Sequence, residues 1–220
     1  MKRKRGFIIC FVGLDGSGKT TLSNRVIKIL KNKYDLKCEY IWAKFGINTI
    51  SNVKRRVKTC NLEYKTDNPY KHPFKNNIIL HIYLLYILIE HWVRIIIKIR
   101  LPLLYGKNFM CDRYYYDSIV DVVVNFDITY IKAKEIFRFF IGIPEPLIVF
   151  YIEIPEEVAY ARKKDIYKLS YLKDRKKVYS FLKEDFKMIS LDGTQSLEKM
   201  EEQISYTLSS YLESDIRCQG

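Results

Sequence analysis

The chain has 220 residues, of which 48% are hydrophobic, so it is long enough to bury one substantial core, and we expect a single domain over residues 1–220. Its formal net charge of +13 favours anionic ligands such as nucleotides, nucleic acid or an acidic membrane surface, although a lysine-rich solvated surface would give the same charge. The five cysteines are spread along the chain without a C-x-x-C pair, which argues against a disulfide scaffold and favours a reducing, cytoplasmic compartment.

Apolar runs rich in β-branched residues alternate with amphipathic runs along the whole chain. The short apolar runs predict buried strands over residues 7–12, 39–42, 109–111, 147–152 and 188–191. The amphipathic runs predict helices over residues 19–32, 76–100, 130–140, 155–164, 171–184 and 196–212. Strands and helices in alternation indicate an α/β fold, with a five-stranded parallel sheet covered by helices on both faces.

Two apolar segments resemble membrane-directed sequences, but charged residues interrupt both. Residues 1–13 read as a basic tip followed by the first strand, because Asp15 and Lys19 follow at once without a cleavage site. Residues 78–105 contain too many charges for a membrane span, so we expect no membrane partner.

The predicted helix over residues 76–100 is apolar on nearly every side. One sheet can cover only one face of such a helix, so we expect the other face to pack on a second copy of the chain in a homodimer. Leu84 and Leu88 lie one turn apart and share a face, which could meet either the sheet or the partner.

A phosphate-binding loop follows the first predicted strand in the segment "FVGLDGSGKTT". The segment matches G-x-x-x-x-G-K-[ST], with a strand before it and a helix after it, as a loop that binds ATP requires. Lys19 is expected to reach the β and γ phosphates as a catalytic residue, and the Thr20 hydroxyl to bind Mg²⁺. The predicted ATP-binding residues are Gly13, Asp15, Gly16, Ser17, Gly18, Lys19, Thr20 and Thr21.

The segment "FMCDRYYYDS" places Asp112 at the end of another predicted strand. A carboxylate at the carboxyl end of a buried strand beside the phosphate loop is suited to organise Mg²⁺. We therefore expect Asp112 to bind the metal together with Thr20, although an ordinary strand-end role would give the same pattern.

The segments "GLDGSGKTT" and "CDRY" together resemble the thymidylate kinases. The segments "LIVFYIEIPEEVAYARKK" and "ISLDGTQSLEKM" extend the resemblance to the fourth strand, the lid and the adenine-side loop of that family, so it covers nearly the whole chain. The resemblance implies a P-loop kinase fold, and transfer of the γ-phosphoryl group of ATP to thymidine 5′-monophosphate with Mg²⁺ as cofactor.

The resemblance also implies roles for individual residues. Arg113 would clamp phosphate between the two nucleotides as a catalytic residue, and Asp15 would contact the acceptor sugar hydroxyl or a water close to it. Some members of the family carry an arginine where this chain has Gly16, so here a basic lid at about residues 162–176 would supply the cation. Arg162 is the first candidate and Arg175 the second, because a planar guanidinium suits a phosphoryl group.

Three departures from the family pattern bear on the acceptor. Lys44 stands where the family has an arginine-proline signature, and His91 lies near the position of an arginine that faces thymine. Tyr116, in the run of three tyrosines after Arg113, could stack on a base or fill the core. The acceptor could therefore be thymidylate, another nucleotide or a sugar phosphate.

Two other classes of function remain open from the sequence. A nucleic-acid-binding ATPase would fit the basic charge, but no further basic-aromatic module is present, so we expect no nucleic-acid partner. A regulatory protein that binds nucleotide without turnover is the other alternative.

Overall fold

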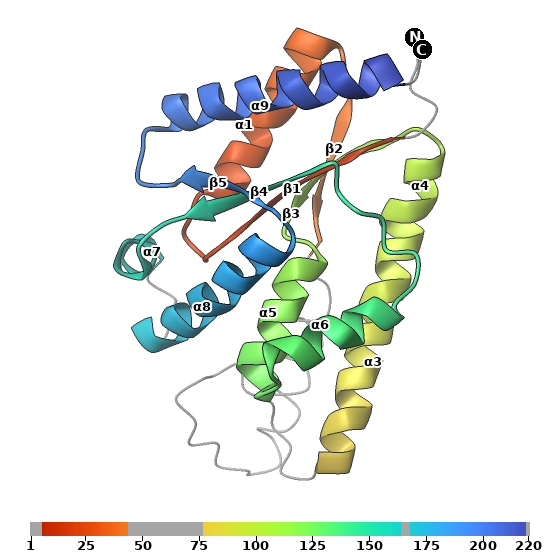
Figure 1. The fold of residues 1–220 in the computed structure, drawn as a ribbon, viewed down its shortest axis with the longest axis vertical. Helices are drawn as coiled ribbons and strands as arrows, with labels where there is room; N and C mark the ends of the chain where they lie inside the picture. Colours follow the sequence, from red (N-terminus) through yellow and green to blue (C-terminus); the bar gives the residue numbers. More distant parts are fainter. Residues whose placement is uncertain (1–5, 44–76, 164–167, 219–220) are drawn as a thin grey trace.

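The computed structural model describes residues 6–43, 77–163 and 168–218. Within these residues, five parallel strands form one sheet in the order β2-β3-β1-β4-β5 (Figure 1). The strands are β1 (Ile8–Gly13), β2 (Cys38–Trp42), β3 (Asn108–Asp112), β4 (Ile148–Glu153) and β5 (Ile189–Asp192). The predicted α/β fold with a parallel sheet is therefore confirmed.

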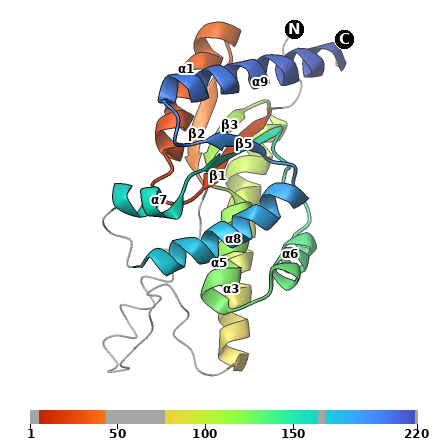
Figure 2. The ribbon, with the colours of Figure 1, turned by 60° about the vertical axis from the view of Figure 1, so that its left-hand side comes forward.

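Helices cover both faces of this sheet. In Figures 1 and 2, α1 and α9 lie on one face, whereas α5 and α8 lie on the other with α3 alongside α5. The helices are α1 (Lys19–Tyr34), α3 (Asn77–Ile95), α4 (Leu101–Leu104), α5 (Tyr115–Phe126), α6 (Tyr130–Phe139), α7 (Glu156–Arg162), α8 (Leu169–Asp185) and α9 (Leu197–Cys218). A π-helical turn over Ile96–Arg100 joins α3 to α4.

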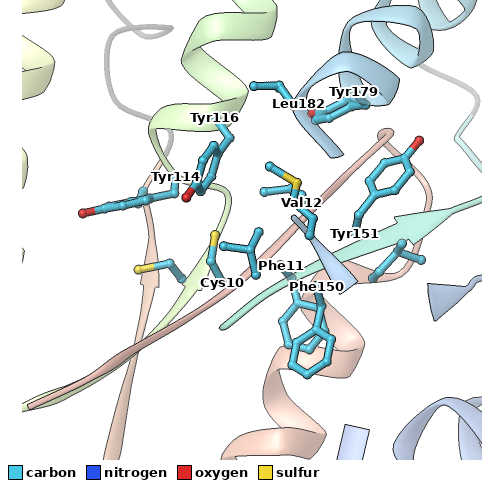
Figure 3. Close-up of a cluster of buried hydrophobic side chains, with 14 of the residues drawn as sticks. Cys10, Phe11, Val12, Tyr114, Tyr116, Phe150, Tyr151, Tyr179 and Leu182 are labelled. Carbon is cyan, nitrogen blue, oxygen red and sulfur yellow. The ribbon is translucent and has the colours of Figure 1, made fainter. Parts of the chain in front are cut away.

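The core is built by the alternation of side chains along the central strands. Phe11 of β1 and Phe150 of β4 are register partners, and their rings stack with centroids 5.3 Å apart (Figure 3). The next residue of β4, Tyr151, points to the opposite face and stacks on Tyr179 of α8 with centroids 5.7 Å apart. Truncating a buried ring such as Phe11 to alanine costs about 3–5 kcal/mol, so these two layers carry much of the stability.

Helix α5 occupies residues for which the sequence predicted no helix. Its sequence, YYDSIVDVVVNF, is rich in tyrosine and valine, which favour strands. The helix forms because its inner face is fully enclosed, with Ile119 and Val120 buried against the core. A side-chain cap supports its start, where Asp117 Oδ2 accepts a hydrogen bond of 3.4 Å from the Tyr114 backbone N–H.

Helix α3 has one buried face and one exposed apolar face. Leu84 and Leu88 are buried, so they lie on the inner face. Large apolar side chains exposed on the other side, including Ile97 of the following π-helical turn, form what we call the α3 outer face: Ile78, Ile79, Ile82, Leu85, Tyr86, Ile89, Val93 and Ile97. Among the helices of the described ranges, none is both long enough and apolar enough to cross a membrane.

Candidate active site

The phosphate loop connects β1 to α1 and depends on three glycines with positive φ. Gly13, Gly16 and Gly18 have φ angles of +144°, +88° and +92°, which disfavour other residues. A Cβ atom at Gly16 would lie 2.7 Å from the carbonyl oxygen of Ala159, so the loop packs tightly against α7. At Gly18, a Cβ would meet nothing within 4 Å. The loop therefore has open space at the N-terminus of α1, where backbone N–H groups favour anions.

Lys19 is held inside the curve of this loop. Its ammonium donates hydrogen bonds to the carbonyl oxygens of Gly13 at 3.0 Å and Leu14 at 2.6 Å. The Ser17 hydroxyl lies 3.3 Å away, and the lysine side chain is buried. The loop thus encloses a positive charge, as recognition of donor phosphates requires.

Thr20 and Asp112, the two predicted metal ligands, contact one another across neighbouring elements. Asp112 ends β3, and its Oδ2 accepts hydrogen bonds from Thr20 Oγ1 at 2.5 Å and from the Tyr40 hydroxyl at 2.9 Å. The other oxygen, Oδ1, is buried and has no hydrogen-bond partner among the described residues. A hydroxyl and a carboxylate oxygen are the hard ligands that Mg²⁺ prefers, and one or two carboxylates beside substrate phosphates suffice to hold it.

Tyr40 is a site residue that the sequence analysis missed. Burial and the neighbouring Asp112 raise the pKa of Tyr40 to about 12, so its hydroxyl remains a donor to the carboxylate. Register pairs Trp42 with Asp112 and Tyr40 with Met110, which puts Tyr40 on the same face of the sheet as Asp112. The strand register places Tyr40 beside Asp112, and this register could not be read from the sequence.

Arg113 links the phosphate loop to α5. Its φ of +71° lies in the left-handed region, which is uncommon for a residue other than glycine and is a mark of functional sites. Its guanidinium forms ion pairs with Asp15 in the phosphate loop and, at 3.2 Å, with Asp117. Lys163 Nζ lies 4.0 Å from the same Asp15 oxygen. Asp15 and Arg113, which were predicted separately, are thus direct partners.

The two arginines proposed for the lid have different surroundings. Arg162 ends α7 and is exposed, with its guanidinium nitrogens 3.4 and 3.5 Å from the carbonyl oxygen of Gly193. Arg175 is fully buried in α8, 2.5 Å from Asp121 Oδ1 and 3.0 Å from the Tyr171 hydroxyl. Of the two arginines, Arg162 is therefore the exposed one, and Arg175 is enclosed in the core with its partners.

The predicted lid over residues 162–176 is partly a packed helix. Residues 169–176 belong to α8, where Leu172 is buried. Residues 164–167 lie outside the described part of the chain.

Of the residues expected on the acceptor side, His91 and Tyr116 are buried, and Lys44 is not among the described residues. His91 is buried in α3, and its Nε2 lies 3.2 Å from the Ser118 hydroxyl of α5. Burial lowers the pKa of His91 to about 4, so the ring is neutral near pH 7. The ring of Tyr116 packs on Phe186 with centroids 4.9 Å apart, which is the core-filling alternative rather than the base-stacking one. Lys44 lies outside the described residues.

The strand order, the phosphate loop and the placement of Asp112 define the α/β fold of the P-loop kinases. No family model matches the chain. The chain is similar to the protein named thymidylate kinase of Plasmodium falciparum (isolate 3D7), with 26% identity over 214 residues that cover 92% of this chain and 89% of the relative. The similarity therefore extends over both proteins nearly from end to end.

Proposed function

We propose that this chain is a kinase that transfers the γ-phosphoryl group of ATP to the 5′-phosphate of thymidine monophosphate, giving dTDP and ADP. The observation that carries the proposal is the convergence of Lys19, the Thr20–Asp112 pair and Arg113 at one end of the sheet. The name of the Plasmodium relative supports the same class of reaction.

Each residue supplies positioning or charge rather than covalent chemistry. Lys19 and the N–H groups of the loop would hold the donor phosphates. Thr20 and Asp112 would hold Mg²⁺, which when bound neutralises charge on the phosphates. Arg113 would hold phosphate on the acceptor side, with Asp15 beside it near the acceptor sugar. These residues would thereby align donor and acceptor and neutralise charge, which is the main contribution of a protein to phosphoryl transfer.

Arg162 is the proposed lid cation. Its exposed guanidinium makes long contacts of 3.4 and 3.5 Å with the Gly193 carbonyl, which a phosphate oxygen could replace. The planar, permanently charged group suits the transferring phosphoryl, which Lys163 would meet as a point charge.

The described residues say less about the identity of the acceptor than about the donor. Lys44 would meet the acceptor phosphate. The resemblance places His91 near the base, although its ring is buried against Ser118 of α5. The neutral His91 ring offers one N–H donor and one acceptor nitrogen, whereas an arginine offers five donors. A kinase for another nucleotide or for a sugar phosphate is therefore the second candidate.

A panel of acceptors with ATP and Mg²⁺ tests both candidates. We expect transfer to thymidine monophosphate, with weaker discrimination against uridine-type monophosphates than an arginine-containing site would give. Lys19→Ala serves as the blank for contaminating kinases. Transfer to a sugar phosphate, without transfer to any pyrimidine monophosphate, would favour the second candidate.

We also propose that the α3 outer face joins two copies of the chain. Leu85 and Tyr86 are 54% and 56% exposed, and exposed apolar residues follow one another along the helix at helical spacing. The turn after α6 extends the surface: Trp92 of α3 donates a hydrogen bond to the Ile141 carbonyl, and the Ile141 side chain is exposed. A self-complementary helix face is the usual basis of a two-fold dimer.

We also propose that the protein binds a nucleotide substrate and works in a reducing compartment. Cys10, Cys38 and Cys111 are free thiols, which fits the cytoplasm. No nucleic-acid partner is proposed.

A further inference from the structure

The Asp117 side chain is fully buried, and the proposed reaction assigns it no role. Its Oδ1 accepts hydrogen bonds from Arg113 Nη1 at 3.2 Å and from the Tyr179 hydroxyl at 2.5 Å. Its Oδ2 accepts one from the backbone N–H of Tyr114 at 3.4 Å. A buried carboxylate needs hydrogen-bond donors, and these donors come from the segment after β3 and from α8.

Tyr179 is fixed as a donor toward this carboxylate. Burial and the neighbouring Asp117 raise the pKa of Tyr179 well above its ordinary value, so the phenol keeps its proton. The phenol oxygen also lies 3.4 Å from Arg175 Nη2, and Arg175 is paired with Asp121 of α5. Helix α8 therefore holds Asp117 in place through Tyr179.

The two carboxylates on Arg113 differ in their exposure. The Asp117 side chain has 0% of its surface exposed, whereas that of Asp15 has 19% exposed and lies in the phosphate loop. An anion that approaches Arg113 can displace the partly exposed carboxylate at Nη2. It cannot reach the buried one at Nη1. One edge of the planar guanidinium is thus fixed by the core, and the other faces the loop.

We propose that Asp117 is a positioning residue for Arg113 and that Tyr179 of α8 orients Asp117, so that Arg113 presents its Nη2 edge to phosphate. This deepens the proposed function, and it rests on it in assigning a phosphate ligand to Arg113. The left-handed backbone of Arg113 aims the side chain, and Asp117 fixes its rotation.

Nuclear magnetic resonance of the arginine side chains tests the positioning without any substrate. In the parent, we expect slow rotation about the Cζ–Nε bond of Arg113, because two carboxylates hold the guanidinium. Asp117→Asn should make this rotation faster by about tenfold or more, and Tyr179→Phe by a smaller factor. Tyr130→Phe is the matched control: it removes a phenol that donates a hydrogen bond of 2.7 Å to Asp185 of the same helix α8, and it should leave Arg113 unchanged. Unchanged rotation in Asp117→Asn would overturn the proposal.

Kinetics test the consequence for phosphate. Asp117→Asn should lower kcat by about tenfold and leave the KM for ATP within about twofold. In an Arg113→Ala background, the same substitution should change kcat by less than about twofold, because Asp117 acts through Arg113. An equal loss in both backgrounds would show a merely structural role and would contradict the inference.

Thermal unfolding is measured for every variant, and Tyr179→Phe replaces Asp117→Asn in both experiments if the latter fails to fold. If the parent transfers phosphate to no acceptor, the proposed function fails, whereas the rotation of Arg113 still decides the positioning.

Discussion

The hydroxyl of Thr20 donates a hydrogen bond of 2.5 Å to Asp112 Oδ2, which joins the first turn of α1 to the end of β3. The contact exists because β3 lies beside β1, with Phe11 and Asp112 as register partners. The phosphate loop follows the end of β1 and the proposed metal-binding carboxylate ends β3, so the two lie close together although they are far apart in the sequence.

Asp112→Asn should lower the rate of phosphoryl transfer by about 100-fold or more, because a neutral amide binds Mg²⁺ less well than a carboxylate. Rates measured over a range of magnesium concentrations should also show a higher requirement for the metal. Glu39→Gln changes an exposed carboxylate on the adjacent strand and should have no such effect. An Asp112→Asn variant with the parental rate and metal requirement would exclude the proposed metal site.

Lys19→Ala should lower turnover by several powers of ten, because a contact with the transferring phosphates is lost. The fold should remain, since the ammonium donates hydrogen bonds to atoms of its own loop rather than supporting the packing of the core. Steady-state kinetics and thermal unfolding check both statements. Lys28→Ala, on the exposed side of α1, is the control. Turnover within tenfold of the parent would contradict the proposed role of Lys19.

His91 should make the protein less stable as the pH falls from 6.5 towards 4. Burial depresses its pKa from the ordinary 6.5 to about 4, with Asp121 and Glu90 opposing this shift and Arg94 adding to it. Between these values the unfolded chain binds a proton that the folded chain excludes, so stability is lost as pH falls. The expected loss at pH 5 relative to pH 7 is about 2 kcal/mol.

Urea unfolding of the parent and of His91→Gln at pH 7 and pH 5 measures this contribution. The difference between the two pH values should be smaller in the variant. His81→Gln, at an exposed position of the same helix, should keep the parental dependence. A parental pH dependence in His91→Gln would exclude the buried imidazole as its source.

Substitutions on the two faces of α3 should have different outcomes. Leu85→Lys places a charge on the α3 outer face and should give a folded monomer, whereas Leu84→Lys places it in the core, where Leu84 is 5% exposed, and should unfold the chain. Light scattering at micromolar concentration gives the mass of the parent and of Leu85→Lys. A monomeric parent would refute the dimer.

The strands and the phosphate loop could be predicted from the sequence because local patterns encode them. Every predicted strand agrees with the structure to within one residue at each end. Apolar runs of three to six residues identify the strands, and the loop motif is contiguous, so neither depends on distant parts of the chain. The prediction that residues 39–42 are buried is wrong, because β2 is an edge strand with exposed side chains.

Helix α5 and the buried Arg175 could not be predicted because distant contacts determine them. Valine and tyrosine in α5 favour a strand locally, and only the packing of that segment on β1 and α8 makes it a helix. Arg175 was expected on a solvated surface or at a nucleotide. Its partner Asp121 is 54 residues away on another helix, and no local pattern indicates that pair.

The register of the sheet also fixes which way the proposed metal-binding carboxylate points. Cys111 and Asp112 face opposite sides, so a slip of β3 by one residue against β1 would exchange a thiol for the carboxylate beside Thr20. The packing of Phe109, Met110 and Cys111, which are buried on both faces of β3, therefore determines where the carboxylate lies. Packing defects along β3 should consequently impair turnover under conditions in which the chain still retains its helices.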